Sequence, residues 1–224
     1  NGALTLDVAA AVGGTGAGVA GVDVSEPMLA VAAERARAAG LGDVRFHQAD
    51  AQVSPLDEVD VVVSRFGVMF FDDPVAAFTN LRASASGGRL AFVCWQPLER
   101  NDWMWLPMGA MAPYLAPQPP ADPGAPSPWA FGDADHVADV MAAAGWRGAG
   151  SGGPEQPLPP RGGGPPGRAA AVVLGTAATR GMTDGVADAD LARARAALDE
   201  VLAAHEGPDG VAFPSAVWVV TATA

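Results

Sequence analysis

The stretch Val19-Ala20-Gly21-Val22-Asp23-Val24-Ser25 decides how this chain is interpreted. Its small and β-branched residues are typical of a short buried strand, and Asp23 stands near the end of that strand. The next residues, Glu26-Pro27, suit the first turn of a helix that Ser25 caps and that Gly40 ends. A strand that passes directly into a helix indicates an α/β fold.

The same alternation of strand and helix continues on both sides. Apolar spacing predicts a helix over 4–12, further strands over 44–47, 59–64 and 89–95, and a helix over 74–83. The segment 59–64 is a nearly continuous β-branched run, as expected for a strand that is covered on both faces. We therefore predict a doubly wound, mostly parallel sheet with right-handed crossovers.

The pattern changes after Trp95. Residues 98–116 are dense in Trp, Met and Pro, and 113–128 contains seven prolines. Helices are predicted over 133–144 and 187–205. The Gly/Pro-rich stretch between these helices is interpreted as a loop with one strand near it, and the end of the chain as strand.

Composition excludes several classes of protein. The net charge is −12, and all 13 basic residues are Arg without a basic cluster, so no nucleic-acid partner is expected. Cys94 is the single cysteine, which excludes an internal disulfide and a thiolate metal cluster, and no metal site is predicted. No apolar stretch reaches the roughly 18 residues that span a bilayer. The first residues lack the basic n-region of a signal peptide, and the acidic charge balance leads us to expect a cytoplasmic protein.

Two glycine clusters compete as a nucleotide-binding turn. Gly16-Ala17-Gly18-Val19-Ala20-Gly21 satisfies G-x-G-x-x-G, but it follows a predicted helix and runs into a strand, whereas the motif requires the reverse order. We interpret it as a plain connection. Asn1-Gly2 instead precedes a helix, and Asp23 follows about 20 residues later, where an acid holds ribose hydroxyls in nucleotide-binding folds.

Polar residues follow three consecutive predicted strands. Asp23 and Asp50 end the first two, and Ser64-Arg65-Phe66-Gly67 ends the third. The carboxyl ends of parallel strands meet at one edge of a sheet, and ligands bind outside that edge. With Gly2, these strand ends predict one ligand site.

These residues resemble those of the class I S-adenosylmethionine-dependent methyltransferases. The matching segments cover the glycine motif, the second strand, the adenine segment, the fourth strand and the turn before the fifth: Asn1-Gly2-Ala3, 21–29, Gln48-Ala49-Asp50-Ala51, 61–74 and 81–90. Ser86 stands where the family has Pro. Residues 92–98 further resemble a bacterial small-molecule branch that is akin to quinone-biosynthesis methyltransferases.

The resemblance implies a seven-stranded sheet in the order 3-2-1-4-5-7-6 with a helical, proline-rich cap. Residues 211–223 would supply the antiparallel strand 7, and a strand near 146–159 would supply strand 6. Strand 1 and the first glycines of the motif would precede Asn1, so we expect that this chain begins inside a longer natural one. A single domain, 1–224, is expected, with a cofactor-binding half, a cap insertion and a closing C-terminal half: 1–97, 98–132 and 133–224.

The resemblance also implies that the chain binds S-adenosyl-L-methionine and releases S-adenosyl-L-homocysteine. Asp23 would accept from the ribose hydroxyls, Asp50 from the adenine amine, and Val24 and Met28 would enclose the adenine ring. The residues expected to contact the cofactor are Asn1, Gly2, Asp23, Val24, Met28, Asp50, Ala51, Ser64, Arg65 and Phe66.

The methyl acceptor is expected to be a small apolar or aromatic molecule, with O, N or C as its reacting atom. Candidate contacts are Phe66, Trp103, Met104 and Met108, although core packing explains the methionines equally well because they share a helical face. No catalytic base is assigned; His136 is a candidate that a solvated place in a first helical turn explains more simply. We expect a monomer or homodimer.

Two alternatives stay open from the residues alone. A methyltransferase-fold protein with a non-methylating role, such as a cyclase or hydroxylase, would keep Asp23 and Asp50. A binding protein without a cofactor would be distinguished by its failure to bind S-adenosylmethionine. An NAD oxidoreductase is disfavoured, because its glycine fingerprint lies in the wrong structural context.

Overall fold

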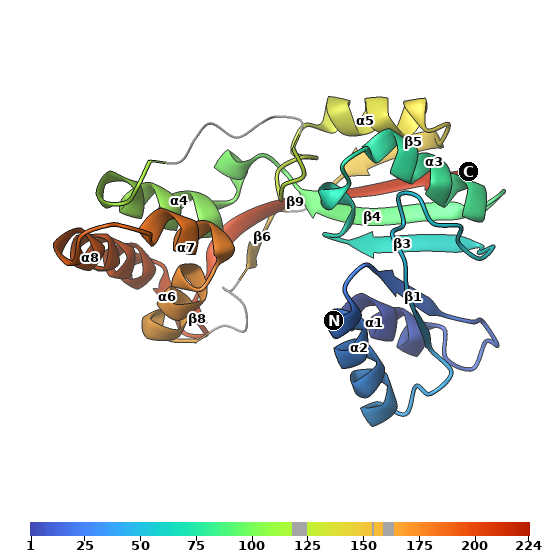
Figure 1. Ribbon diagram of the computed structural model, residues 1–224, viewed down its shortest axis with the longest axis horizontal. Helices are drawn as coiled ribbons and strands as arrows, with labels where there is room; N and C mark the ends of the chain where they lie inside the picture. The colour runs from blue at the N-terminus through green and yellow to red at the C-terminus, as the bar shows by residue number, and fades with distance from the viewer. Residues whose placement is uncertain (118–124, 154, 159–163) are drawn as a thin grey trace. The chain divides into compact units, whose positions relative to one another are not determined.

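A computed structural model describes four stretches of the chain, 1–117, 125–153, 155–158 and 164–224. They form two compact units. Unit 1 comprises 1–93, 135–151 and 220–224, and unit 2 comprises 94–134 and 152–219. Three strands contribute residues to both units: β4 (Arg89–Trp95), β5 (Arg147–Gly152) and β9 (Phe213–Thr223) (Figure 1).

Unit 1 begins with two helix–strand pairs, whose bounds are α1 (Ala3–Ala11), β1 (Ala20–Asp23), α2 (Glu26–Ala38) and β2 (Arg45–Gln48). The main-chain N of Met28 donates to Oγ of Ser25 at 3.4 Å, which confirms the predicted cap of α2. β1 and β2 pair in parallel, with Asp23 opposite Gln48. The predicted helices and strands of this region are present within a residue or two.

The rest of unit 1 is built on a second pair of parallel strands, β3 (Val61–Arg65) and β4. A 3-10 turn and two helices follow, η1 (Val68–Phe70), α3 (Pro74–Ser84) and α5 (Ala134–Ala143). The ring of Phe78 on α3 lies 5.3 Å from that of Phe92 on β4. Nε1 of Trp146, just after α5, donates to the carbonyl of Phe78 at 2.9 Å. These contacts fix α3 against β4.

The described strands do not form one seven-stranded sheet. β3, β4, β9 and β5 (Arg147–Gly152) form a mixed sheet in the order β3-β4-β9-β5, and β6 (Glu155–Leu158) pairs antiparallel with β9. β1 and β2 form a separate two-stranded sheet. The α/β character is as predicted, but the single continuous sheet is not observed in the described part. The outer edges of β1 and β3 therefore remain unpaired there.

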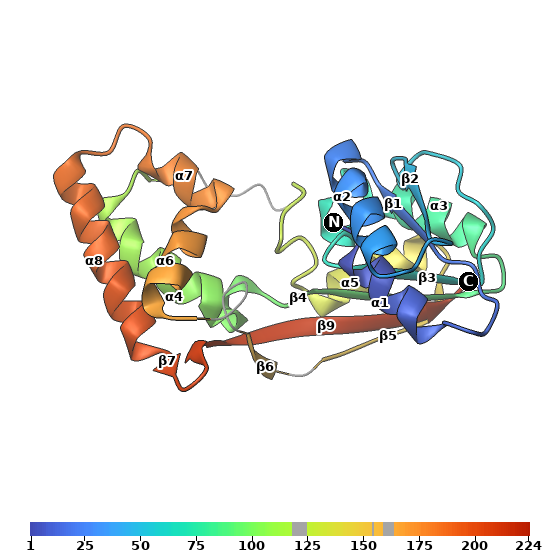
Figure 2. The same ribbon diagram turned by 90° about the horizontal axis from the view of Figure 1, so that it is seen from below.

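Unit 2 is mainly helical (Figure 2). Its helices are α4 (Asp102–Met111), α6 (Pro166–Leu174), α7 (Ala177–Thr183) and α8 (Asp188–Ala204), with 3-10 turns η2 (Leu98–Arg100) and η3 (Ala112–Tyr114). A short hairpin joins β7 (Glu206–Gly207) and β8 (Gly210–Val211). The core of these helices is a cluster of buried residues that includes Met111, Leu198, Leu202 and Phe213.

Sequence periodicity predicted α8 but missed α6 and α7. Both are short, they lie among Gly and Pro residues, and Gly175 separates them. Their apolar positions, such as Ala170 and Val173, are buried in the cluster that α8 completes. Tertiary packing stabilises such short helices, and it has no local signal in the sequence. Among the described residues, no helix has the length and apolar character needed to cross a membrane.

Candidate functional site

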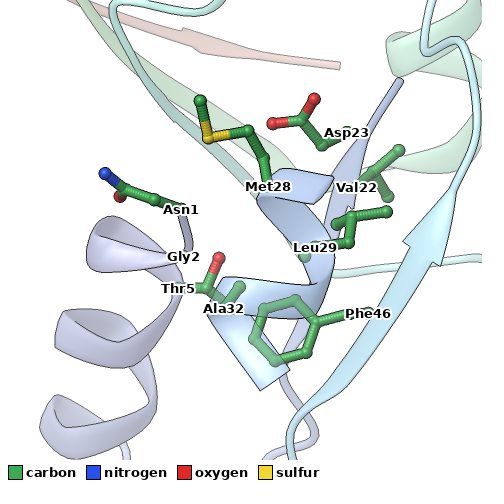
Figure 3. Close-up of a pocket in the computed structure, with 10 residues that line it drawn as sticks. Asn1, Gly2, Thr5, Val22, Asp23, Met28, Leu29, Ala32 and Phe46 are labelled. Atoms are coloured by element: carbon green, nitrogen blue, oxygen red, sulfur yellow. The ribbon is translucent and has the colours of Figure 1, made fainter. Parts of the chain in front are cut away.

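A small hollow of about 70 Å³ lies in unit 1 where α1, β1, α2 and β2 meet (Figure 3). Its lining comes from the start of α1, the end of β1, the first turns of α2 and the middle of β2: Asn1, Gly2, Thr5, Gly21, Val22, Asp23, Met28, Leu29, Ala32 and Phe46. Four residues predicted from the sequence, Asn1, Gly2, Asp23 and Met28, therefore line one concave surface.

Gly2 allows two backbones to approach closely at this hollow. It has φ +73°, a conformation that L side chains rarely adopt, and a Cβ built on it would lie 2.5 Å from Cβ of Ala32. The residue before it is held as well, because Nη1 of Arg35 donates to the carbonyl of Asn1 at 3.0 Å. The start of α1 is thus fixed beside α2.

Asp23 ends β1 with one carboxylate oxygen engaged. The main-chain N of Ser25 donates to its Oδ1 at 2.9 Å, which sets the turn into α2. The described residues offer Oδ2 no hydrogen-bond partner, and the side chain is half-buried. Asp23 therefore combines a fixed orientation with a free acceptor, as a ligand-binding carboxylate requires.

Exposed apolar side chains lie on both sides of Asp23. Val24 is 64% exposed and Met28 is 48% exposed. Figure 3 shows Met28 next to the Asp23 carboxylate. Large apolar groups left in water beside a polar group are typical of a surface that receives a ring-shaped ligand.

Asp50 is brought to the same end of the two-stranded sheet. The main-chain N of Ala49 donates to the carbonyl of Asp23 at 3.2 Å, and Nε2 of Gln48 donates to the carbonyl of Val24 at 3.1 Å. Asp50 follows directly, and its Oδ1 accepts from the main-chain N of Gln52 at 2.9 Å. The two acids thus end adjacent strands, as the sequence predicts.

The loop after Asp50 is fastened to α3. Nδ2 of Asn80 donates to the carbonyls of Ala51 and Ser54, at 2.9 and 2.8 Å. These two hydrogen bonds to main-chain carbonyls fix the path of the loop and the position of the Ala51 peptide. Asn80 was not predicted as a contributor, because its role depends on where α3 lies relative to the loop.

The end of β3 has an unusual backbone. Phe66 has φ +63° and is the one residue other than glycine with a positive φ in the described stretches. Its main-chain N donates to the carbonyl of Val93 at 2.9 Å, and Nη1 of its neighbour Arg65 contacts Oδ2 of Asp7 on α1 at 3.3 Å. Such backbone strain is concentrated at functional sites, so it supports the prediction for Ser64-Arg65-Phe66.

The remaining candidates lie elsewhere. Trp103 and Met108 of α4 pack against the hydrophobic cluster of unit 2, and Met104 on the same helix is half-buried. His136 is exposed in the first turn of α5. No group of three or more potential metal ligands occurs in the portion of the chain that the structure describes. The structure therefore gathers the predicted cofactor residues within unit 1, and the predicted acceptor residues of α4 belong to unit 2.

Six lining residues of the hollow are not among the contacts predicted from the sequence: Thr5, Gly21, Val22, Leu29, Ala32 and Phe46. Ala32 could have been found, because it lies four positions after Met28 and so on the same helical face. Thr5 and Phe46 both lie against Gly21 of β1, an approach between elements for which the sequence has no local signal.

Comparison with known families addresses the same part of the chain. Residues 1–88 match the family described as "Methyltransferase domain". This match covers less than half of the 224 residues. The matched segment runs from the Asn1-Gly2 turn to the start of β4 and includes every predicted cofactor residue.

Curated relatives match part of the chain as well. The chain is 42% identical over 85 residues to a demethylmenaquinone methyltransferase of Thermus thermophilus. The aligned segment covers 37% of this chain and 38% of that protein. The chain is also 36% identical over 104 residues to an uncharacterized protein of Mycobacterium tuberculosis. This second alignment covers 42% of this chain and 38% of that protein. The matches thus span less than half the length of each relative.

Solved structures share the fold over most of the chain. A putative methyltransferase from Bacillus halodurans has a TM-score of 0.57 at 16% identity, over 98% of this chain and 88% of that one. YcgJ from Bacillus subtilis has a TM-score of 0.54 at 16% identity, over 91% and 81%. The [4+2]-cyclase SpnF has a TM-score of 0.51 at 20% identity, over 99% and 71%. At these identities the likeness concerns the fold alone.

Proposed function

We propose that this chain binds S-adenosyl-L-methionine at the carboxyl ends of β1 and β2 and transfers its methyl group to a small molecule. The observation that carries the proposal is Asp23, whose free Oδ2 lies beside the exposed side chains of Val24 and Met28. A carboxylate next to apolar surface fits a ribose joined to an adenine ring. The match of 1–88 to the methyltransferase domain family supports the same ligand.

Each residue has a defined task in this proposal. Asp23 accepts from the ribose hydroxyls through Oδ2, while its Oδ1 stays on Ser25. Asp50 accepts from the adenine amine, the Ala51 main-chain N donates to a ring nitrogen, and Val24 and Met28 enclose the ring. The fixed turn at Asn1-Gly2 leaves its backbone open toward the methionine part, and Ser64-Arg65-Phe66, at the end of β3, contacts that same part of the cofactor.

The chemistry asks little of the protein beyond positioning. The sulfonium group of the cofactor supplies an activated methyl group, and the chain holds donor and acceptor in line and excludes water. No side chain is assigned as a general base. We propose an apolar or aromatic acceptor, because α4 of unit 2 is rich in Trp and Met, including Trp103, Met104 and Met108.

We further propose that the protein acts in the cytoplasm as a monomer or homodimer and as one functional domain over 1–224. The single cysteine and the net charge of −12 support a reducing compartment and the absence of nucleic-acid partners.

Calorimetry with S-adenosylmethionine tests the binding site. Asp23→Asn keeps an oxygen for the Ser25 N–H but replaces the free acceptor with an amide, so the turn survives while the ribose contact is lost. We expect affinity to fall about tenfold or more, the effect of losing a charge-assisted hydrogen bond. Asp43→Asn removes an exposed acid outside the site and should leave affinity unchanged. Equal affinities for the wild type and Asp23→Asn would disprove the assignment.

A second experiment separates methyl transfer from a non-methylating role of the same fold. The chain is incubated with S-adenosylmethionine labelled in its methyl group and with phenols, amines and quinone-like acceptors. Acceptor-dependent release of S-adenosyl-L-homocysteine with label in the product is the expected result. Binding without release would favour the non-methylating alternative, which matters because the fold is also that of a cyclase.

A further inference from the structure

Gln96 is the first residue after the carboxyl end of β4, and it lies in unit 2. It is 2% exposed. Its main-chain N donates to the carbonyl of Ala216 at 3.0 Å, and its side-chain Nε2 donates to the carbonyl of Val217 at 3.0 Å. Its Oε1, by contrast, is buried and has no hydrogen-bond partner among the described residues.

The oxygen and nitrogen of the Gln96 side-chain amide cannot exchange places. Reversing it would place Oε1 against the carbonyl of Val217, and two acceptors cannot share a hydrogen bond. Nε2 is therefore committed to β9, and the oxygen is the atom left over. A buried acceptor without a partner destabilises the fold, so such atoms call for an explanation, such as a bound ligand or water.

The neighbouring Asn101 shows how completely polar groups are satisfied here. It is fully buried, and its Nδ2 donates to the carbonyls of Gln96 and Pro97, both at 3.1 Å. Its Oδ1 accepts from the main-chain N of Ala216 at 3.1 Å and from Nε1 of Trp103 at 3.3 Å. Asn101 thus joins the backbone of Gln96 to the indole of Trp103 and uses all its hydrogen-bonding capacity.

Three tryptophans form a row in the same unit. The rings of Trp95 and Trp103 are 5.1 Å apart and tilted by 45°, and those of Trp103 and Trp129 are 6.2 Å apart and tilted by 41°. All three side chains are half-buried rather than fully covered. Trp95 precedes Gln96 in the chain, and Asn101 links the indole of Trp103 to the main-chain carbonyl of Gln96. Partly open aromatic rings offer stacking surface to a flat ligand.

We propose that this end of β4 binds a planar aromatic molecule that carries an O–H or N–H group. The rings of the tryptophan row stack on the ligand, and its donor reaches Oε1 of Gln96. A donor that reaches this buried oxygen leaves water, and hydrogen bonds are stronger in such surroundings. That this ligand is the methyl acceptor rests on the proposed function, and it narrows the acceptor to the phenol or aromatic amine class.

Calorimetry with two naphthalenes tests the binding without any cofactor. 2-Naphthol carries the donor, whereas 2-methoxynaphthalene has the same rings without it. We expect the wild-type chain to bind 2-naphthol about tenfold more tightly, the worth of one hydrogen bond to a buried acceptor. Equal affinities, or no binding of either compound, would overturn the proposal on the wild-type chain alone.

Variants then assign the effect to its atoms. Gln96→Met removes the oxygen but keeps an unbranched side chain, and it should reduce the affinity ratio to about one. Trp103→Leu should weaken the binding of both compounds. Trp105→Leu is the matched control: it changes a tryptophan of the same helix that is 46% exposed, and it should leave both affinities unchanged. A preference that persists in Gln96→Met would show that Oε1 does not accept from the ligand, and it would overturn the proposal.

Failure of this proposal is distinct from failure of the proposed function. The naphthalene experiment reports on unit 2 without S-adenosylmethionine, and the Asp23→Asn experiment reports on the cofactor site of unit 1 without an acceptor. The first can fail while the second succeeds, and the reverse.

Discussion

Gly2 is subject to two separate constraints, a positive φ and a close contact with Ala32. Gly14 has a similar φ, +79°, but a Cβ there would meet nothing within 4 Å. Gly14→Ala should therefore cost about 1 kcal/mol through backbone strain alone. Gly2→Ala adds a steric clash and should lower the free energy of unfolding by about 2 kcal/mol or more. Urea denaturation measures both, and equal losses would show that Ala32 can move aside.

Cys94 shows what burial does to a single ionisable group. It is fully buried, and burial raises the pKa of its thiol to about 12. Only the thiolate reacts with alkylating agents, so the native protein should resist iodoacetamide at pH 8, and the urea-unfolded protein should be labelled at once. Intact mass measures the label. Rapid labelling of the native chain would contradict the buried position of β4.

The raised pKa of Cys94 also makes the free energy of unfolding depend on pH. The ordinary pKa of the thiol is 9.0, so an unfolded chain loses this proton at a lower pH than the native chain does. The contribution of Cys94 to the free energy of unfolding is complete below about pH 9 and falls as the pH rises toward about 12. Cys94→Ser removes this group and should flatten that part of the profile.

At the level of elements, the parts predicted from the sequence are those with a local signal. The cap at Ser25 and the β-branched run over 59–64 correctly placed α2 and β3. Asp23 and Asp50 were predicted to end adjacent parallel strands, and the described pairing of β1 with β2 places them there. Helix α6 and the hollow residue Phe46 were missed, because each depends on which elements pack together.

Helix α8 contributes several buried residues to the core of unit 2, so substitutions on its buried face should lower the free energy of unfolding. Leu198 is fully buried in the cluster, whereas Leu191 of the same helix is only partly buried. Leu198→Ala should lower the free energy of unfolding by about 2–5 kcal/mol through lost burial and a cavity. Leu191→Ala should cost clearly less. Urea denaturation followed by tryptophan fluorescence checks this, and equal costs would contradict the described packing of α8.

Over the whole molecule, net charge and open strand edges act against each other. The chain carries −12 at pH 7 and has a pI of about 4.4, so like charges keep copies apart at neutral pH. β3 lies at the end of its sheet in the described part, with Val61 54% and Val63 41% exposed. An apolar edge strand is a template for pairing with another chain. Light scattering should therefore rise as the pH falls toward about 4.4.

A charge on that edge should suppress the association, because an ionised side chain at a strand edge opposes pairing. Val61→Lys introduces one positive charge on β3, and Val53→Lys introduces the same charge at a turn position that is 68% exposed. Both variants change the net charge equally, so a difference between them reports the edge rather than the pI. We expect Val61→Lys to lower the scattering near pH 4.4 and Val53→Lys to leave it almost unchanged. Equal suppression by both would mean that overall charge alone controls the association and that the open edge of β3 takes no part.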